Sequence, residues 1–345
     1  MTEPPSFLRK GAPAPTLDDV ARAAGVSTAT VSRALNSPKR VAEATRERVM
    51  SAVRQLDYTP NFSARAMASR ASHTIGAVIP TMENAIFAKG IQAFEEELHA
   101  RGYMLLVASS SYNPAREAEQ VRALVSRGVD GILLIGHDRD PAVLKYLEAR
   151  HTPAVAAWSF NPAGALPSVG FNNRIAMRFL AERVLSLGHV RLGMISGETA
   201  RNDRARLRLQ GVQDAMWHAG ARPEELALIE TTYGIEEGGD AFMELINRRP
   251  RPTAILCGND VLAAGALVAA RECGLVVPRD VSITGFDDIE LAHLVQPSLT
   301  TVHVPHREMG QKAAATLVDM LEAGKQPVHL ELETRLAIRA SLAAV

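Results

Sequence analysis

The sequence is poor in cysteine, in aromatic residues and in long apolar runs. Only two of its 345 residues are cysteines and 5% are aromatic. Cys257 and Cys273 lie in apolar segments, so we expect two buried thiols and no disulfide. No apolar run approaches the roughly 18 residues of a membrane span, and residues 1–15, with four prolines, do not resemble a secretory signal. We therefore expect a soluble cytoplasmic protein with no membrane partner.

The chain also has no net charge, which taken whole argues against a nucleic-acid partner. That zero hides an uneven distribution. Residues 1–70 hold 11 Lys and Arg against six Asp and Glu, a balance of +5. The other 275 residues hold 27 basic against 32 acidic side chains, a balance of −5. Because net charge matters where it is concentrated, the first 70 residues form a candidate nucleic-acid-binding segment.

Common enzyme motifs are missing as well. No glycine-rich dinucleotide fingerprint follows the first expected strand, and neither the phosphate-cradling Gly-x-x-x-x-Gly-Lys-Ser/Thr nor the nucleophile elbow Gly-x-Ser-x-Gly occurs. His303 and His306 form the only close histidine pair, without metal-type spacing to other ligands. We expect no enzyme activity, no metal and no cofactor, although doubly wound sheets often host enzymes.

The first 60 residues predict a small helical block. Thr16 and Asp19 have the spacing of a capping box at the start of a helix over 17–24, and Gly25 suits the turn that ends it. Ser27 then caps a second helix that ends near residues 36–38, and a third helix is expected over 43–56. This helix–turn–helix pattern with excess positive charge is typical of a DNA-reading module.

In such a module the second helix enters the major groove with its N-terminal side chains at the base edges. Arg33 suits a guanine and the Thr and Ala methyl groups suit thymine, whereas small polar side chains suit phosphates. The alternative is a helical hairpin with a solvated basic face. The expected base contacts are Thr28, Ala29, Thr30 and Arg33, and the expected phosphate contacts are Thr16, Ser27, Ser32, Asn36, Tyr58 and Asn61.

From residue 72 onward, short apolar runs alternate with amphipathic helices, which predicts doubly wound parallel sheets. A break at 161–167 divides this region into two similar lobes. The expected strands cover 75–79, 104–108, 131–135, 154–158, 192–196, 228–231, 254–257 and 282–286. The expected helices cover about 87–101, 115–127, 141–149, 173–187, 205–219, 238–247, 260–273 and 307–323.

Motifs along the whole chain resemble the lactose-repressor (LacI) family of regulators. The resemblance is strongest in TLDDVARAAGVSTATVSRALN over residues 16–36. It continues in family order through TRERV at 45–49, LDYTPN at 56–61, ARAMA at 64–68, GVDGI at 128–132, GND at 258–260, VSITGFDD at 281–288 and PSLTT at 297–301.

The resemblance implies a hinge over 61–69 that folds on operator binding and enters the minor groove. The implied contacts there are Ala64, Arg65 and Met67. Met67 stands where relatives usually carry Leu as the wedge between base steps, which leaves the kink angle and spacing preference open.

The resemblance also implies a body like the periplasmic sugar-binding proteins, with an effector between two lobes. Arg208 is then a clamp, Asp287 accepts two hydroxyl groups and Asn259 adds a polar contact. Phe87, Tyr233 and Trp158 are implied as aromatic walls. Each has a plainer alternative: Arg208 as a surface charge, Asp287 as a turn residue, Asn259 as a helix cap and the aromatics as core.

Within the family, IPTMENAIF at 79–87 and YNPARE at 112–117 are similar to the gluconate-utilisation repressor branch. An Arg-rich pocket edge would suit the carboxylate of a sugar acid, although neutral sugars also bind such sites. We expect a small sugar or sugar-acid effector.

The sequence therefore predicts a homodimeric repressor on a pseudo-palindromic operator of double-stranded DNA. We expect an arm over 1–15, a DNA-binding domain over 16–60, a hinge and linker over 61–74, and an effector and dimerisation domain over 75–345. In the last, one lobe covers about 75–162 and 305–324, the other about 163–303 and 326–345. An activator and a corepressor-driven repressor remain open, whereas a periplasmic receptor would need an export signal and no basic head.

Overall fold

The computed structural model describes residues 15–59, 71–83, 85–323, 326 and 328–345, with Asn36, Ala85 and Ala323 described by backbone alone. The expected contacts Asn61, Ala64, Arg65 and Met67 lie outside the described residues, and for Asn36 no side chain is described. The chain divides into two compact units, residues 1–72 and 73–345, which we call the head and the body.

The described residues of the head form three α-helices, and the first two begin at the expected caps. The Thr16 hydroxyl donates to the Asp19 carboxylate at 2.7 Å, and Gly25 takes the left-handed φ of 62° that ends α1. The Ser27 side chain accepts from the Thr30 amide at 3.2 Å. The helices are α1 (Leu17–Ala24), α2 (Thr28–Asn36) and α3 (Glu43–Gln55), with a 3-10 turn over Pro38–Arg40.

The head core is small because each helix contributes only one apolar stripe. Val20, Val31, Val49 and Tyr58 are buried together at its centre. Burying these faces against one another stabilises the three short helices, which would be marginal alone. The predicted helix–turn–helix is confirmed.

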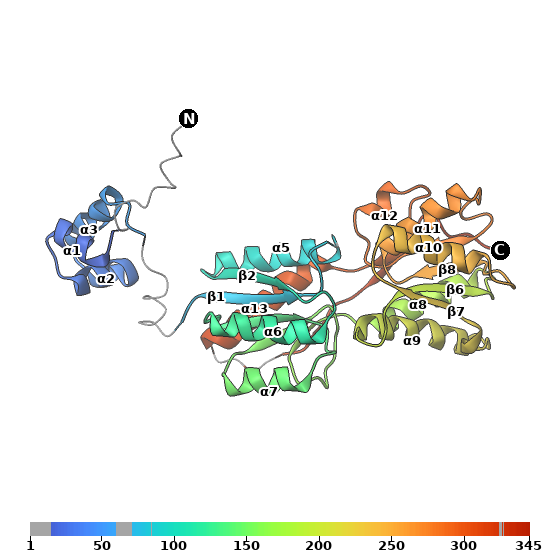
Figure 1. The fold of residues 1–345 in the computed structure, drawn as a ribbon, viewed down its shortest axis with the longest axis horizontal. Helices are drawn as coiled ribbons and strands as arrows, with labels where there is room; N and C mark the ends of the chain where they lie inside the picture. Colours follow the sequence, from blue (N-terminus) through green and yellow to red (C-terminus); the bar gives the residue numbers. More distant parts are fainter. Residues whose placement is uncertain (1–14, 60–70, 84, 324–325, 327) are drawn as a thin grey trace, which may run out of the picture. The chain divides into compact units, whose positions relative to one another are not determined.

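The first lobe of the body is a six-stranded parallel sheet between two helical layers. Its strand order is β11-β5-β4-β3-β1-β2. Helices α5 and α13 pack together on one face, and α6 and α7 lie on the other (Figure 1). The strands are β1 (Thr74–Ile79), β2 (Met104–Ser109), β3 (Gly131–Ile135), β4 (Ala154–Ala157), β5 (Ser168–Gly170) and β11 (Leu330–Glu331); the helices are α5 (Ala85–Ala100), α6 (Pro114–Ser126), α7 (Pro141–Ala149) and α13 (His306–Ala323).

The second lobe repeats this plan with a four-stranded parallel sheet, order β7-β6-β8-β9. Helices α8 and α9 cover one face and α10 and α11 the other (Figure 1). A separate antiparallel pair joins β10 to β12. The strands are β6 (Leu192–Gly197), β7 (Ala227–Thr231), β8 (Ala254–Cys257), β9 (Ser282–Thr284), β10 (Thr301–His303) and β12 (Arg335–Ala337); the helices are α8 (Asn173–Ser186), α9 (Asp203–His218), α10 (Ile235–Ile246), α11 (Asp260–Glu272) and α12 (Leu291–Leu294), with a 3-10 turn over Pro223–Glu225.

The division between the lobes differs from the expected one. Strands β5 and β11 belong to the first sheet, although the sequence places 163–303 and 326–345 in the second lobe. Strand β5 pairs with β4 through Ala156 and Ser168. Neither strand exceeds three residues, so no apolar run marks them in the sequence. The chain thus passes between the lobes after β5, before α13 and again after β11.

Two further points concern exposure. Cys257 is buried as expected, but Cys273 is exposed because it ends α11 at the lobe surface. The expectation of two buried thiols is therefore wrong for Cys273.

In the part of the chain that the structure describes, no helix has the length and apolar character needed to cross a membrane.

Candidate functional sites

The N-terminal turn of α2 presents the residues predicted to read DNA. Thr28, Ala29 and Arg33 are exposed, and Thr30 is partly so. The Thr30 hydroxyl lies 2.9 Å from the Ser27 hydroxyl, so these two side chains are held together at the start of the helix. These residues form a small surface that carries the long cation of Arg33, which is compatible with the predicted contact in the major groove.

The predicted phosphate contacts divide into two kinds. Ser27 and Thr16 are exposed, and each also caps a helix. Ser32 is partly exposed on α2. Tyr58 is only 8% exposed and packs in the head core, so most of its ring serves the fold. Tyr58 therefore has a structural role in the head core, whereas the sequence analysis predicted only a phosphate contact for it.

In the body, Arg208 is buried in α9 and not at the surface. Its Nε donates to the Asn173 Oδ1 at 2.9 Å and its Nη1 to the Gly258 carbonyl at 2.5 Å. The guanidinium carbon stands 3.8 Å from the centre of the Phe286 ring. These contacts hold the guanidinium plane in one orientation, which suits a clamp rather than a solvated charge.

The partner of Arg208 is Asp287, which follows β9. The Arg208 Nη2 lies 3.6 Å from the Asp287 Oδ1. Asp287 is fully buried, and neither of its carboxylate oxygens has a hydrogen-bond partner among the described residues. Burial raises the pKa of Asp287 to about 6, against the lowering effect of Arg208 and Arg204. A buried carboxylate without hydrogen-bond partners in the described chain is a candidate ligand contact.

Asn259 is also buried, and its two amide atoms have different roles. Its Oδ1 accepts from the Leu262 amide at 2.9 Å and caps α11, whereas its Nδ2 has no partner among the described residues. The neighbouring Asp260 instead accepts from the Thr301 hydroxyl and the Ile289 amide. Asn259 is therefore both a helix cap and a donor available to a ligand.

The predicted aromatic residues fall in two places. Trp158 and Phe87 are buried with ring centres 5.4 Å apart, and the Trp158 indole nitrogen has no partner in the described residues. Trp158 has a φ of 64°, costly for a non-glycine residue. Tyr233 lies at the cavity described below. Phe87 faces an apolar groove with Met82 and Val107, so the core alternative fits it best.

His306 and Asn173 complete this assembly, and sequence reasoning did not select them for it. Asn173 donates to the Trp158 carbonyl at 3.0 Å while accepting from Arg208, and the His306 Nε2 donates to the Asp287 carbonyl at 3.2 Å. The His306 Nδ1 has no partner in the described chain. We call Trp158, Arg208, Asn259, Asp287 and His306 the buried polar cluster. Native interiors satisfy most polar atoms, so the unsatisfied atoms of Trp158, Asn259, Asp287 and His306 make this cluster a candidate binding site.

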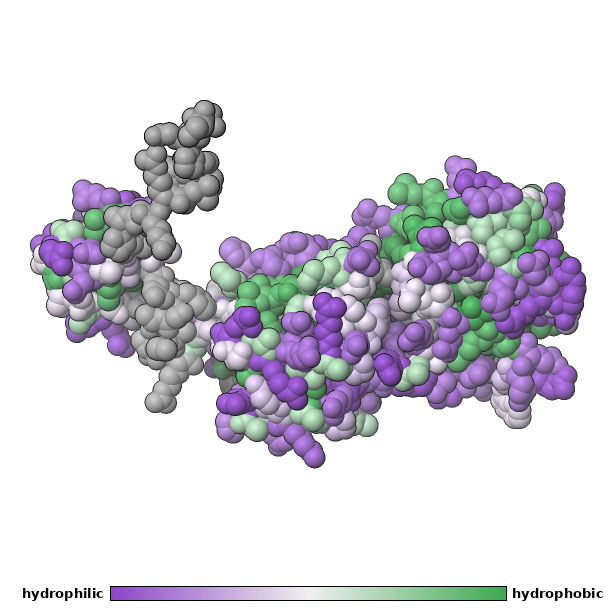
Figure 2. All heavy atoms as spheres, viewed as in Figure 1, coloured by the Kyte–Doolittle hydropathy of each residue, from purple (hydrophilic) through white to green (hydrophobic). Residues whose placement is uncertain are grey.

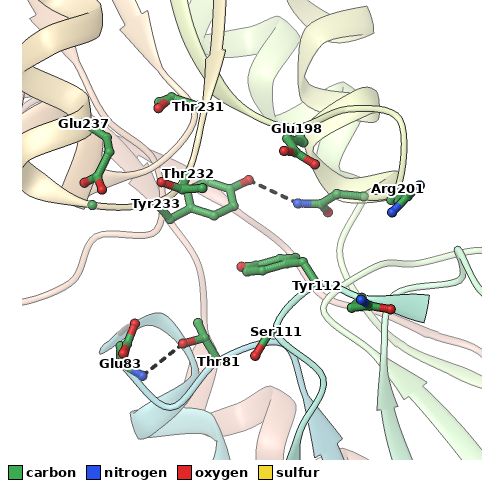
Figure 3. A pocket seen from close by; sticks show the side chains of 13 residues that line it. Thr81, Glu83, Ser111, Tyr112, Glu198, Arg201, Thr231, Thr232, Tyr233 and Glu237 are labelled. Carbon is green, nitrogen blue, oxygen red and sulfur yellow. Dashed lines mark hydrogen bonds between the residues drawn. The ribbon is translucent and has the colours of Figure 1, made fainter. Parts of the chain in front are cut away.

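A cavity of about 580 Å³ opens between the lobes, at the carboxyl ends of β1, β2, β6 and β7 (Figure 3). Its volume is within the range of small-molecule sites. Of the predicted effector contacts, all of which are described, only Tyr233 lines it. The lining comprises Thr81, Glu83, Ser111, Tyr112, Asn113, Glu198, Arg201, Asn202, Thr231, Thr232, Tyr233, Gly234 and Glu237.

Tyr112 and Tyr233 come from opposite lobes and contact each other at this cavity, with ring centres 5.6 Å apart and planes tilted by 39° (Figure 3). The Tyr233 hydroxyl accepts from the Asn202 amide at 3.2 Å. Burial raises the pKa of both phenols, and the charges of Arg208 and Asp287 act on both. None of the residues of the buried polar cluster lines the cavity itself.

Charged contacts join the lobes at one side of the cavity. Arg206 of α9 makes a two-pronged contact with Asp138, both distances 2.7 Å, and the His137 amide donates to the Asp203 carboxylate at 2.9 Å. Gly136, at φ 70°, allows this approach, because a Cβ there would collide with Asp203 and Arg204. The described residues contain no group of three or more His, Cys, Asp and Glu side chains suited to a metal.

Comparisons with known proteins agree with this architecture. Residues 16–61 match the family described as bacterial regulatory proteins, lacI family, and residues 181–342 match the periplasmic binding protein-like domain. The HTH-type transcriptional repressor PurR of Proteus mirabilis is 36% identical over 335 residues, which cover 95% of this chain and 97% of PurR.

Two solved structures are similar over the same extent. The lac repressor dimer bound to operator and the anti-inducer ONPF has a TM-score of 0.86 at 27% identity, covering 96% of this chain and 100% of that one. The regulator CelR in complex with cellobiose has a TM-score of 0.70 at 29% identity, covering 95% and 99%. With its helix–turn–helix head and periplasmic-binding-protein-like body, the chain belongs to the LacI family of DNA-binding transcriptional regulators.

Proposed function

We propose that this protein is a homodimeric, cytoplasmic repressor whose affinity for a pseudo-palindromic operator is set by a small sugar-like effector in the body. The observation that carries the proposal is the buried polar cluster of the body, with its unsatisfied atoms, in a chain that also carries a helix–turn–helix head. Sequence specificity would come from Arg33 and its α2 neighbours, and the residues 61–69 would enter the minor groove beside them.

On this proposal, Asp287 accepts hydrogen bonds from two ligand hydroxyls, while Arg208 and the Asn259 amide donate to ligand oxygens. Hydroxyl-rich ligands with apolar C–H faces match such a mixture of paired polar groups and the rings of Tyr233 and Trp158. The complex of CelR with cellobiose supports a sugar as the ligand class.

A sugar acid such as gluconate is the weaker candidate. It was expected from the motifs at 79–87 and 112–117 and from an Arg-rich pocket edge, which the arginines of residues 201–208 supply. Three of them already face carboxylates: Arg204 with Asp203, Arg206 with Asp138 and Arg208 with Asp287. Their charges are thereby largely balanced, which removes the main reason for an anionic ligand.

An effector in this cavity would act through the lobes. It can shift DNA affinity only as far as it prefers one lobe arrangement over another. The contacts of Asp203 and Arg206 with the first lobe lie on α9, the helix that carries Arg208. A ligand that pulls on Arg208 would therefore strain or strengthen these contacts, and the operator-binding state would change with them.

The proposed dimer uses the exposed edge of the first sheet. Strand β2 ends that sheet, and its Met104 and Val107 are 60% and 38% exposed. Figure 2 shows hydrophobic residues at the surface over the region of β2 and α5. An exposed apolar edge strand in a soluble chain is a liability unless a partner covers it. The similar lac repressor, a dimer on its operator, supports a second copy as that partner.

Substitution of Val107 by Glu tests the dimer. We expect V107E to sediment as a monomer at micromolar concentration and to lose most of its operator affinity, because two heads must act together. The matched control is Val268→Glu, which is also 38% exposed but lies on α11 of the second lobe. A dimeric V107E, or a monomeric V268E, would contradict the assignment of this edge.

The proposed function as a whole is tested by selecting binding sites for the full-length protein from random duplex DNA. We expect an inverted repeat with half-sites about one helical turn apart. Cellobiose, glucose and gluconate are then added to the complex in turn while fluorescence anisotropy reports release. Failure to enrich any repeat, or an operator affinity that no polar small molecule changes, would sink the proposal.

A further inference from the structure

The buried polar cluster has two unpartnered nitrogen atoms on the first lobe. Trp158 follows β4 and His306 begins α13, and the centres of their rings lie 6.4 Å apart. Trp158 is 1% exposed and His306 is 5% exposed. Neither the Trp158 Nε1 nor the His306 Nδ1 has a hydrogen-bond partner among the described residues. Because buried polar atoms are almost always paired, these two nitrogens are candidate contacts of a bound molecule.

The hydrogen bond of its other ring nitrogen defines the role of His306. The His306 Nε2 lies 3.2 Å from the main-chain carbonyl oxygen of Asp287, which can only accept, so Nε2 carries the proton. Burial lowers the pKa of His306 to about 4, against the raising effect of that hydrogen bond. The ring is therefore neutral at about pH 7, and its Nδ1 presents a bare lone pair that can accept a hydrogen bond.

Trp158 supplies the opposite kind of group, because an indole N–H donates and cannot accept. Two features place its ring. Trp158 has a φ of 64°, a left-handed backbone that costs free energy in a non-glycine residue. On α5, Gly90 leaves room for the indole, since a Cβ there would lie 2.5 Å from the ring. Strained backbone of this kind is retained where the position of a side chain matters.

A buried donor and a buried acceptor on the same lobe match one chemical group best. A hydroxyl group accepts a hydrogen bond through its oxygen and donates one through its hydrogen. An ionised carboxylate would leave the His306 Nδ1 without a donor, and an ammonium group would leave the Trp158 N–H without an acceptor. The second lobe differs, since its Arg208 and Asp287 are charged groups that lie 3.6 Å apart.

We propose that Trp158 and His306 form a neutral subsite on the first lobe for one hydroxyl group of the effector. The hydroxyl accepts from the Trp158 Nε1 and donates to the His306 Nδ1, and the second lobe holds the rest of the ligand through Arg208, Asn259 and Asp287. The inference rests on the proposed effector role of the buried polar cluster. It adds His306 as a residue that determines specificity, and it gives Trp158 a polar contact besides that of its ring.

Two substitutions of His306 separate contact with the ligand from support of the fold. Asn places an amide oxygen at the position of the His306 Nδ1, whereas Gln places an amide nitrogen near the position of Nε2. His306→Gln thus keeps a donor for the Asp287 carbonyl and loses the acceptor for the ligand, and His306→Asn does the reverse. In calorimetric titrations of the full-length protein with glucose, we expect H306Q to bind at least about thirtyfold more weakly and H306N to stay within about fivefold of the unaltered protein. The control is His99→Gln, exposed on α5.

Analogues of glucose that each lack one hydroxyl identify the group that is bound. For the unaltered protein we expect one monodeoxy analogue to bind at least about tenfold more weakly than glucose. In His306→Gln the penalty for that same analogue should fall to less than about twofold, because the partner of the hydroxyl is already gone. Equal penalties in the two proteins would show that His306 acts only through the fold.

The inference is overturned if H306Q binds glucose as tightly as the unaltered protein, if H306N and H306Q lose affinity alike, or if glucose does not bind up to about 20 mM. A crystal structure with glucose bound and only ordered water at the two nitrogens would also overturn it. Operator anisotropy separates these results from the proposed function. Glucose that releases the operator equally well from H306Q and the unaltered protein keeps the effector role and removes the subsite. Glucose that binds with the expected hydroxyl penalty, without operator release, keeps the subsite and removes the effector role.

Discussion

The candidate sites of the head and of the body are built in opposite ways. In the head, Thr28, Ala29 and Arg33 are exposed on one short helix, adjacent in sequence and supported by local caps. In the body, the cluster that includes Trp158, Arg208 and Asp287 is buried and comes from segments far apart in the chain. DNA, a hydrated polyanion, binds to an exposed charged surface. A small neutral or weakly charged molecule binds instead to polar groups that are already buried away from water.

The largest effect that separates the two sites is expected at Asp287. Asp287→Asn tolerates the φ of 106° but replaces an acceptor by a donor, so effector affinity should fall by at least about a hundredfold while operator binding is retained. Ligand titrations and operator anisotropy measure the two functions independently. Asp240→Asn, exposed on α10, is the control, and an unchanged dose response in D287N would remove Asp287 from the site.

A reciprocal effect is expected in the head. Arg33→Ala should lower affinity for the selected operator by about tenfold, because one two-pronged contact with a guanine is lost. Effector binding should not change. The comparison that decides the role of Arg33 is its effect on random DNA: an equal loss there would make it a phosphate contact and not a base contact.

The body contains helix contacts so close that only glycine fits at some positions. In α9, a Cβ at Gly211 would lie 2.3 Å from the Arg174 carbonyl oxygen of α8, so Gly211→Ala should lower the free energy of unfolding of the body by about 1–3 kcal/mol. In α10, Gly239→Ala has its nearest neighbour at 3.5 Å and should be neutral or stabilising. Thermal unfolding followed by calorimetry measures both, and a destabilised G239A with an unaffected G211A would contradict this account.

The head depends instead on local capping, and the expected effects there are smallest. Thr16→Ala removes the capping box of α1 and should lower the stability of the head by about 1 kcal/mol. Ala42→Ser should raise the stability of the head, because Ala42 provides no side-chain cap for α3 and Ser would add one. Both changes should leave the unfolding of the body unaltered. Equal effects on the two units would show that their folding is coupled.

Local chemistry explains which parts of the fold were predictable. The Thr16 box, the Gly25 turn and the alternation of apolar strands with helices act over a few residues and are visible in the sequence. Strands β5 and β11 were missed because two or three residues carry no periodicity, and only pairing with β4 and β5 makes them strands. The same reason explains the misplaced boundary between the lobes.

The candidate sites were predictable to different degrees. The family motifs singled out Arg208 and Asp287, and the structure brings them within 3.6 Å of each other. Tyr112, Asn173 and His306 were not assigned to the site, since each is unremarkable in its own segment. The two left-handed residues Ser111 and Tyr112 carry no glycine that could have signalled a special backbone. Their importance arises only from what the other lobe places opposite them.

The sequence by itself determined the two-unit organisation, the opposite charges of head and body, and the exposed reading helix, because charge balance, helix capping and apolar periodicity are properties of neighbouring residues. The tertiary structure alone decided which polar groups are buried without partners and which charges are already paired. In the sequence, the Arg-rich segment was a reason to expect a sugar acid. In the structure, Arg204 and Arg206 are paired with carboxylates, and the cavity is lined by more acidic than basic side chains. Burial and pairing depend on residues far apart in the chain, so only the fold can show them.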